Sequence, residues 1–205
     1  MGQSMSSARE GIFLQGDREA TEQALQDMDI LHKAMELQLD QFDSQFEEKS
    51  LSQPSSTRSE IPFSRSTRKE RFTNVQIKDG PKRTISRVID SLFNHYREEY
   101  DRAVFEGFKE VVENALAPFM HTTDIGQYEE KKYFIFVIRD TLVRIDVMIW
   151  RWNFTKKGFS NNIQSATGYV LYTSVVDESV LETSEFVSLI SLFSNGGNSK
   201  QYVNR

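Results

Sequence analysis

Apolar positions in the first quarter of the chain recur at helical spacing. Residues 17–49 contain no proline, and their apolar side chains fall alternately three and four positions apart. The seam consists of Leu25, Met28, His32, Met35, Leu39, Phe42 and Phe46. A heptad seam with one polar member, His32, predicts an amphipathic helix that packs against a partner helix. The alternative is that this helix packs on the chain's own C-terminal domain.

Residues 50–80 show no comparable pattern. The segment is rich in Ser, Thr and Arg and has little apolar surface to bury, so it is interpreted as a linker. Lys78-Asp79-Gly80-Pro81 then indicates a turn, with the proline in the first turn of a helix. Helical periodicity continues from Ile85 to Leu116, and we expect this long helix to end before Pro118, which lacks a backbone N–H group.

The period changes from helical to alternating after Pro118. Tyr133–Ile138 is a short apolar run, and Leu142–Phe154 alternates between two faces, one beginning at Leu142 and the other at Val143. This pattern predicts two antiparallel strands joined near Arg139-Asp140-Thr141. Asp140 and Asp146 lie among arginines on these strands, which favours cross-strand ion pairs over a catalytic carboxylate pair.

The remaining C-terminal pattern predicts another strand and a helix. Gly168–Val176 has the composition of a strand, with a short strand around Phe159–Ile163 before it. A helix that begins after Thr183 or Ser184 would end at Asn195-Gly196-Gly197.

The expected fold class is therefore α+β. An N-terminal heptad helix and a disordered basic linker precede a long helix, which packs on a small antiparallel β-meander with a C-terminal helix, in two layers. The predicted division is a flexible tail at 1–16, an acidic helix at 17–49, a basic linker at 50–80, an α+β interaction domain at 81–197 and a C-terminal tail at 198–205.

The net charge of −5 conceals two blocks of opposite sign. Asp17 to Glu48 holds ten acids against two bases, a net charge of −8. Arg58 to Arg87 holds nine bases against three acids, a net charge of +6. The predicted basic surface consists of Arg65, Arg68, Lys69, Arg71, Lys82, Arg83 and Arg87. This surface would bind anionic lipid or keep a linker solvated, whereas nucleic acid binding is not expected because aromatic stacking residues are few and the chain is acidic.

Residues with catalytic potential are sparse. The chain has no cysteine, which excludes disulfides, cysteine-ligated zinc and a thiol nucleophile. The three histidines have no metal-binding spacing, and no phosphate-binding loop or nucleophile elbow occurs. We therefore expect no enzyme, metal or cofactor. The one catalytic alternative is a site formed by His121 and Asp124.

The N-terminus carries a lipidation pattern. Met1-Gly2-Gln3-Ser4-Met5-Ser6 fits the signal for myristoylation at Gly2. The opening Met-Gly-Gln resembles the start of myristoylated retroviral Gag matrix proteins, a resemblance that covers these first residues only. A single acyl chain needs a second membrane signal, which the basic block could supply. Phosphorylation of Ser66, Thr67, Thr84 or Ser86 would weaken such lipid contact.

These patterns favour a non-enzymatic, peripheral-membrane adaptor or matrix-like structural protein on the cytosolic face. It would bind a protein partner, or a second copy of itself, through residues 17–49. The alternative is a cytoplasmic subunit of a multi-protein assembly without a lipid anchor.

Overall fold

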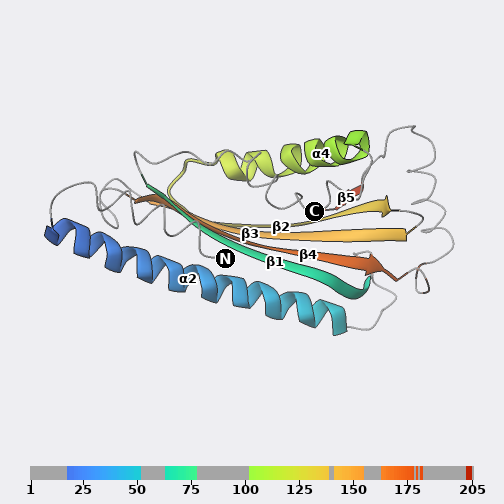
Figure 1. Ribbon diagram of the computed structural model, residues 1–205, viewed down its shortest axis with the longest axis horizontal. Coiled ribbons are helices and arrows are strands. Elements are labelled where there is room, and N and C mark those ends of the chain that lie inside the picture. Colours follow the sequence, from blue (N-terminus) through green and yellow to red (C-terminus); the bar gives the residue numbers. More distant parts are fainter. Residues whose placement is uncertain are drawn as a thin grey trace.

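In the part of the chain that the structure describes, a five-stranded antiparallel sheet has one helix on each face (Figure 1). The computed structural model describes residues 18–51, 63–77, 102–138, 141–154, 163–177, 179, 181 and 202–204. The elements are α2 (Arg18–Leu51), β1 (Phe63–Ile77), α4 (Arg102–His121), β2 (Gly126–Ile138), β3 (Thr141–Asn153), β4 (Ile163–Val176) and β5 (Tyr202–Asn204). The α+β class is confirmed. The helices on opposite faces make three layers, where the sequence predicted two.

The centre of the sheet is a meander of β2, β3 and β4 within the strand order β1-β4-β3-β2-β5. The hairpin of β2 and β3 pairs from Ile138↔Thr141 to Gly126↔Asn153, so its strands run on either side of the expected turn. β4 begins at Ile163 and continues without a break through the predicted Gly168–Val176 strand.

Alternating side chains of β3 separate two apolar clusters. Val143, Ile145 and the other buried apolar side chains on their face of β3 pack beneath α4 with Leu116. Met148 and Trp150, on the opposite face of β3, pack beneath α2. The sheet is buried on both faces, because each set of alternate side chains meets a different helix.

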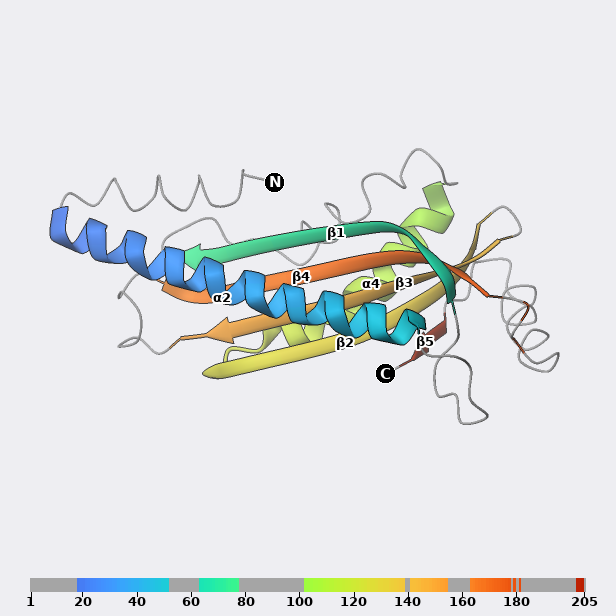
Figure 2. The ribbon, with the colours of Figure 1, turned by 90° about the horizontal axis from the view of Figure 1, so that it is seen from below.

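The structure differs from the predicted linker at residues 63–77, which form the long edge strand β1. β1 pairs with β4 from Phe63↔Val176 to Ile77↔Ile163, and Figure 2 shows it beside β4 along the sheet. Few of its side chains are apolar, but Phe72 stacks on Tyr169 and Val75 is buried beneath α2. Backbone pairing along a full neighbouring strand stabilises a segment whose composition alone indicates disorder.

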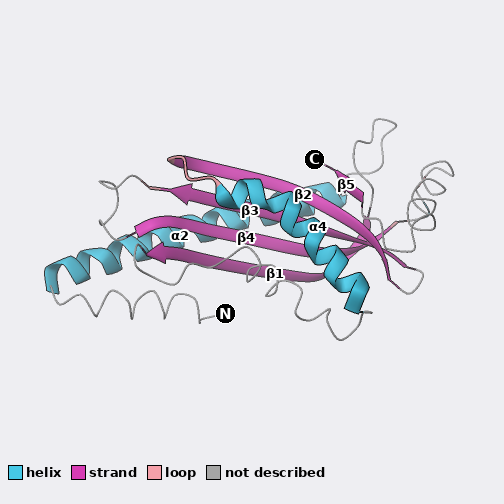
Figure 3. Cartoon of the chain, turned by 90° about the horizontal axis from the view of Figure 1, so that it is seen from above, coloured by secondary structure: helices cyan, strands magenta, loops and turns pink. Residues whose placement is uncertain are grey.

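Helix α4 crosses the strands obliquely (Figure 3) and continues past Pro118 to His121, so the predicted end before this proline is wrong. A donor from β2 and one from the residue that follows the helix bind carbonyl oxygens in its last turns. Lys132 Nζ lies 2.5 Å from the Ala115 oxygen, and Thr122 Oγ1 lies 3.0 Å from the Pro118 oxygen. Such contacts stabilise the C-terminal turns despite the N–H group that Pro118 lacks.

Several predicted features lie outside the described residues. These are the tail at 1–16 with Gly2, the first part of the long helix, residues 159–162 and the helix proposed after Ser184. Within the predicted C-terminal tail, β5 pairs with β2 from Tyr133↔Asn204 to Ile135↔Tyr202. In the described part of the chain, no helix combines the length and hydrophobicity needed to cross a bilayer.

Candidate functional site at the junction of helix α2 and strand β1

The heptad seam of α2 faces the chain's own sheet. Five of its seven members are buried, namely Met28, Met35, Leu39, Phe42 and Phe46. Leu25 and His32 are partly buried. The buried members form one cluster with side chains of β3 and β4, which corresponds to the alternative in which the seam packs on the C-terminal domain. Partner binding by this seam stays a prediction, and it would require α2 to leave the sheet.

A glycine in β4 lets α2 approach the sheet closely. A Cβ atom at Gly168 would lie 3.4 Å from Leu39 Cδ2 and 3.7 Å from Met35 Cβ. A larger side chain would therefore occupy the space that the seam fills. The fit between Gly168 and the seam makes α2 part of the folded core.

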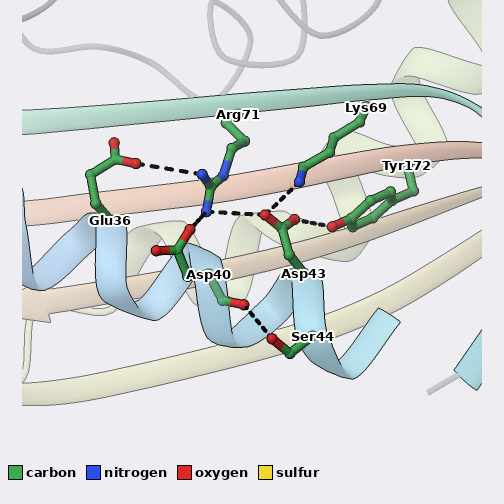
Figure 4. A network of polar contacts seen from close by, with 7 residues as sticks. All are labelled: Glu36, Asp40, Asp43, Ser44, Lys69, Arg71 and Tyr172. Atoms are coloured by element: carbon green, nitrogen blue, oxygen red, sulfur yellow. Dashed lines mark hydrogen bonds and ion pairs between the residues drawn. The ribbon is translucent and has the colours of Figure 1, made fainter. Parts of the chain in front are cut away.

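A row of acids runs along α2 beside the apolar seam. Glu36, Asp40 and Asp43 follow one another at intervals of four and three, each one residue after a seam position. This spacing keeps them on one side of the helix. Lys69 and Arg71 are two residues apart on β1, so both project toward α2. Figure 4 shows the acids and bases meeting between the two elements.

Asp43 is the centre of this network. Its Oδ2 atom lies 2.5 Å from Lys69 Nζ and 3.1 Å from Arg71 Nη2. Its Oδ1 atom accepts a hydrogen bond from the hydroxyl of Tyr172. The Asp43 side chain is only 13% exposed, so these three donors compensate for much of the water that the carboxylate loses.

Arg71 binds a second acid of α2 and lies near a third. Its Nη2 atom is 2.5 Å from Asp40 Oδ1, and its Nη1 atom is 3.7 Å from Glu36 Oε2. Partial burial by itself would lower the pKa of Arg71, but the hydrogen bond to Asp40 and the three nearby carboxylates raise it above its ordinary value. The network therefore favours the charged form of Arg71.

Tyr172 connects the polar network to the aromatic core. Its ring stacks on Phe46 at a centroid distance of 3.6 Å, and Phe46 in turn stacks on Phe63 at 4.9 Å. Lys69 Nζ lies 5.8 Å from the centroid of the Tyr172 ring. Burial raises the pKa of Tyr172, and the hydrogen bond to Asp43 raises it further.

The predicted basic surface is thus partly used inside the fold. Lys69 and Arg71 bind acids of α2, whereas Arg68 pairs with Glu70 along β1 at 2.7 Å. Arg65 is exposed. The other three predicted bases, Lys82, Arg83 and Arg87, lie outside the described residues. In the described region, the acidic and basic blocks of the sequence contact each other.

Four residues of this network were not predicted as site residues: Glu36, Asp40, Asp43 and Tyr172. The signal that could have found the three acids is the equal spacing of the acidic row and the apolar seam. This equal spacing would place the acidic row at the border of the buried helix face, where the basic block of the sequence could bind it. Tyr172 had no such signal, because the pairing of β4 with β1 places it there.

A second polar cluster is buried within β3. Arg144 Nε lies 2.9 Å from Asp146 Oδ2, and Arg144 Nη2 lies 2.5 Å from Asp146 Oδ1. The Arg144 side chain is 2% exposed, and its guanidinium carbon lies 4.1 Å from the centroid of the Tyr133 ring. This ion pair runs along one strand and not across two, because residues two apart on a strand share a face.

A third cluster joins the end of α4 to β3. The half-buried Arg151 donates to the Met120 oxygen, and burial lowers the pKa of Arg151. Asn153 Nδ2 donates to the carbonyl oxygens of Thr122, at 2.9 Å, and Asp124, at 3.0 Å. These bonds hold the loop that carries the catalytic alternative. His121 and Asp124 themselves are exposed there.

The first and third clusters each connect two elements, and the second connects two positions of β3. Among the described residues, no group of three or more His, Cys, Asp or Glu side chains could hold a metal ion. The α2–β1 network can therefore attach helix α2 to strand β1 through ion pairs and hydrogen bonds. No protein-family model matches the chain, and neither curated proteins nor solved structures yielded a match.

Proposed function

We propose that the protein is a non-enzymatic binding subunit of a protein assembly, an adaptor whose docking module is the sheet with α2 attached. The observation that carries this proposal is the α2–β1 network, in which Asp43 binds Lys69, Arg71 and Tyr172. These ionisable groups attach a long helix to a sheet edge and do not converge on a substrate site. A helix attached in this way presents its outer face as a preorganised binding surface.

The test is whether the protein occurs in a complex or as a single chain in its native host. A tagged full-length chain, recovered under mild conditions, is separated by size-exclusion chromatography, and its mass and stoichiometric partners are measured. We expect the wild type in a defined complex. A variant with His121→Ala and Asp124→Asn should assemble and function normally. Migration of the wild type as a single chain would refute the proposal, and an assembled but inactive double variant would favour an enzyme.

A second candidate function is attachment to the cytosolic face of a membrane, and Met1-Gly2-Gln3-Ser4-Met5-Ser6 favours it. The second membrane signal would come mainly from Lys82, Arg83 and Arg87. Lys69 and Arg71 contribute less to lipid binding because acids of α2 already neutralise them.

We expect Gly2→Ala to release the protein from the membrane fraction, because one acyl chain and one basic cluster are both needed for stable anchoring. Sedimentation of the variant with membranes, compared with the wild type, measures this release. Intact mass gives the matched control, since the acylated chain lacks Met1 and carries one myristoyl group. Equal sedimentation of both proteins would exclude the anchor.

A further inference from the structure

A β-bulge sets Thr67 apart from the regularly paired residues of β1. Ser66 pairs with Ser174 of β4. Arg68 pairs with the adjacent residue of β4, Thr173, so Thr67 is the extra residue between them. A bulge changes the direction in which its extra side chain projects, and bulges at sheet edges often have a function of their own. The bulge therefore gives the Thr67 side chain a direction that regular pairing would not give it.

The Thr67 hydroxyl is both exposed and used in the fold. Its Oγ1 atom donates a hydrogen bond of 3.1 Å to the backbone oxygen of Thr173. The Ser66 hydroxyl lies 3.3 Å from the same oxygen and 3.2 Å from the backbone oxygen of Arg68. Thr67 and Ser66 are both exposed. An enzyme can therefore reach the Thr67 oxygen, and its modification would remove a contact between β1 and β4.

The sequence around Thr67 is basic and its backbone is extended. Arg65 lies two positions before Thr67 and is exposed, and Arg68 follows Thr67 directly. In the strand order, β1 has a described neighbour on one side only, which is β4. A serine/threonine kinase that selects arginines beside the hydroxyl holds its substrate segment extended, against acids of its own groove. The bulged edge of β1 has the charge and the backbone form of such a substrate.

We propose that Thr67 is a phosphorylation site, and that its phosphate weakens the attachment of α2 by drawing Lys69 away from Asp43. The Thr67 oxygen attacks the γ-phosphorus of ATP held by the kinase. The bond from that phosphorus to the ADP oxygen breaks, and the hydroxyl proton passes to a base of the kinase. This inference adds regulation of the α2–β1 network to the proposed function, and it rests on that function for its effect on assembly.

Lys69 is the residue through which the phosphate would act on the network. A phosphate adds about 1.5 to 2 negative charges and three acceptor oxygens. Two residues of an extended strand span about 7 Å, a distance that a lysine side chain can reach across. The Lys69 side chain is 41% exposed where it binds Asp43 (Figure 4), so it can turn to the phosphate. Asp43 would keep Arg71 and Tyr172 as donors, and α2 would be held less firmly.

The first experiment uses full-length protein phosphorylated at Thr67, made by incorporating phosphothreonine during translation. Limited proteolysis within α2 measures how readily the helix leaves the sheet. We expect cleavage to be about tenfold faster than in the unmodified protein, because a hydrogen bond and an ion pair are both lost. Thr67→Val removes the hydroxyl without adding charge and should increase cleavage less. At about 1 M salt the phosphorylated protein should approach Thr67→Val, because salt screens the phosphate.

The second experiment tests whether the site is used. Phosphates on the chain from its native host are mapped by mass spectrometry, and we expect one on Thr67. The purified protein is also incubated with ATP and an arginine-directed serine/threonine kinase. Arg65→Gln should slow phosphorylation of Thr67 about tenfold, because a charge contact with the kinase groove is lost. Ser66→Ala is the matched control, and its Thr67 should be phosphorylated as fast as in the wild type.

Three results would overturn the inference. The first is a host chain without phosphate on Thr67, and the second is equal cleavage of α2 in the phosphorylated and unmodified proteins. The third is a Lys69→Gln protein in which the phosphate accelerates cleavage as much as in the wild type, because Lys69 would then not transmit its effect. Proteolysis needs only the isolated chain, so a wild type without partners in its host would refute the proposed function and leave this inference standing.

Discussion

Arg144 is the largest fully buried side chain among the described residues, and the carboxylate of Asp146 compensates its charge. It binds Asp146 through Nε and Nη2, between the rings of Tyr133 and Phe63. A buried ion pair gains little net stability over apolar residues, but loss of one partner leaves an uncompensated charge.

We therefore expect Arg144→Met to lower the free energy of unfolding by about 3–5 kcal/mol. The double variant Arg144→Met with Asp146→Leu should recover most of that loss. Urea denaturation of the single and double variants measures both effects. Ser174→Ala, which removes a buried hydroxyl without a partner opposite Arg144, is the control and should change little. Additive losses in the double variant would contradict the explanation.

Tyr172 predicts a dependence of stability on alkaline pH. Because its pKa is higher in the folded protein than the value of about 10 in an unfolded chain, its contribution is complete below about pH 10. As the pH rises further, the unfolded chain releases this proton first and the folded state loses stability.

We expect Tyr172→Phe to be less stable than the wild type at neutral pH, because Asp43 loses a donor. Between about pH 10 and 12 its stability should decline less steeply, by up to about 1.4 kcal/mol per pH unit. Urea denaturation at a series of pH values gives the two slopes. Equal slopes for Tyr172→Phe and the wild type would show that the pKa of Tyr172 is the same in the folded and the unfolded protein.

At the scale of elements, the contacts between α2 and β1 should differ in strength according to their burial. Asp43 is 13% exposed and binds three donors, whereas Glu36 is 41% exposed and lies 3.7 Å from Arg71. Exposed ion pairs contribute little to stability because water and salt screen them, whereas loss of a buried acceptor leaves its donors unpaired and is costly.

Asp43→Ala should accordingly reduce the free energy of unfolding by about 1–3 kcal/mol, because Lys69, Arg71 and Tyr172 lose their shared acceptor. Lys69→Ala should cost less than about 1 kcal/mol, and Glu36→Ala less again. Thermal and urea unfolding at low and at 1 M salt rank the variants. An equal loss for Glu36→Ala and Asp43→Ala would show that burial does not determine the strength of this network.

The edge position of β1 also explains features of its sequence. Register shifts occur between Phe63 and Arg65 and between Ser66 and Arg68, and Thr67 Oγ1 donates to the Thr173 oxygen. Irregular pairing and basic side chains are the means by which edge strands avoid pairing with other chains. The composition that suggested a linker therefore also suits an edge strand.

For the molecule as a whole, the arrangement in three layers depends on how closely α2 lies on the sheet. The helix crosses β4 at Gly168, where a Cβ atom would be in ordinary contact with Leu39 and Met35. A methyl group fits at that distance, whereas branches beyond it would meet the seam.

We expect Gly168→Ala to fold normally and Gly168→Val to lose about 1–3 kcal/mol through overpacking. Circular dichroism melting measures the stability, and limited proteolysis within α2 reports whether the helix leaves the sheet. Normal stability and protection in Gly168→Val would indicate that α2 does not rest on β4. The seam would then be available for the partner helix that its heptad pattern predicts.

The sequence by itself determined the local periods: a helix with a heptad seam, two alternating strands around residues 139–140, and charge blocks of opposite sign. These features are visible because hydrophobic spacing reports which face of an element is buried. What the seam packs against was left open, since a heptad fits a partner helix or a sheet equally well.

Only the tertiary structure decided that residues 63–77 form a strand, that α4 passes Pro118, and that Asp43 meets Lys69 and Tyr172. Each depends on groups distant in the sequence. Backbone bonds to β4 compensate β1 for its few apolar residues, and Lys132 donates to a carbonyl near the end of α4. Local propensity does not record such compensation, because the partner that supplies it is brought close only when the chain folds.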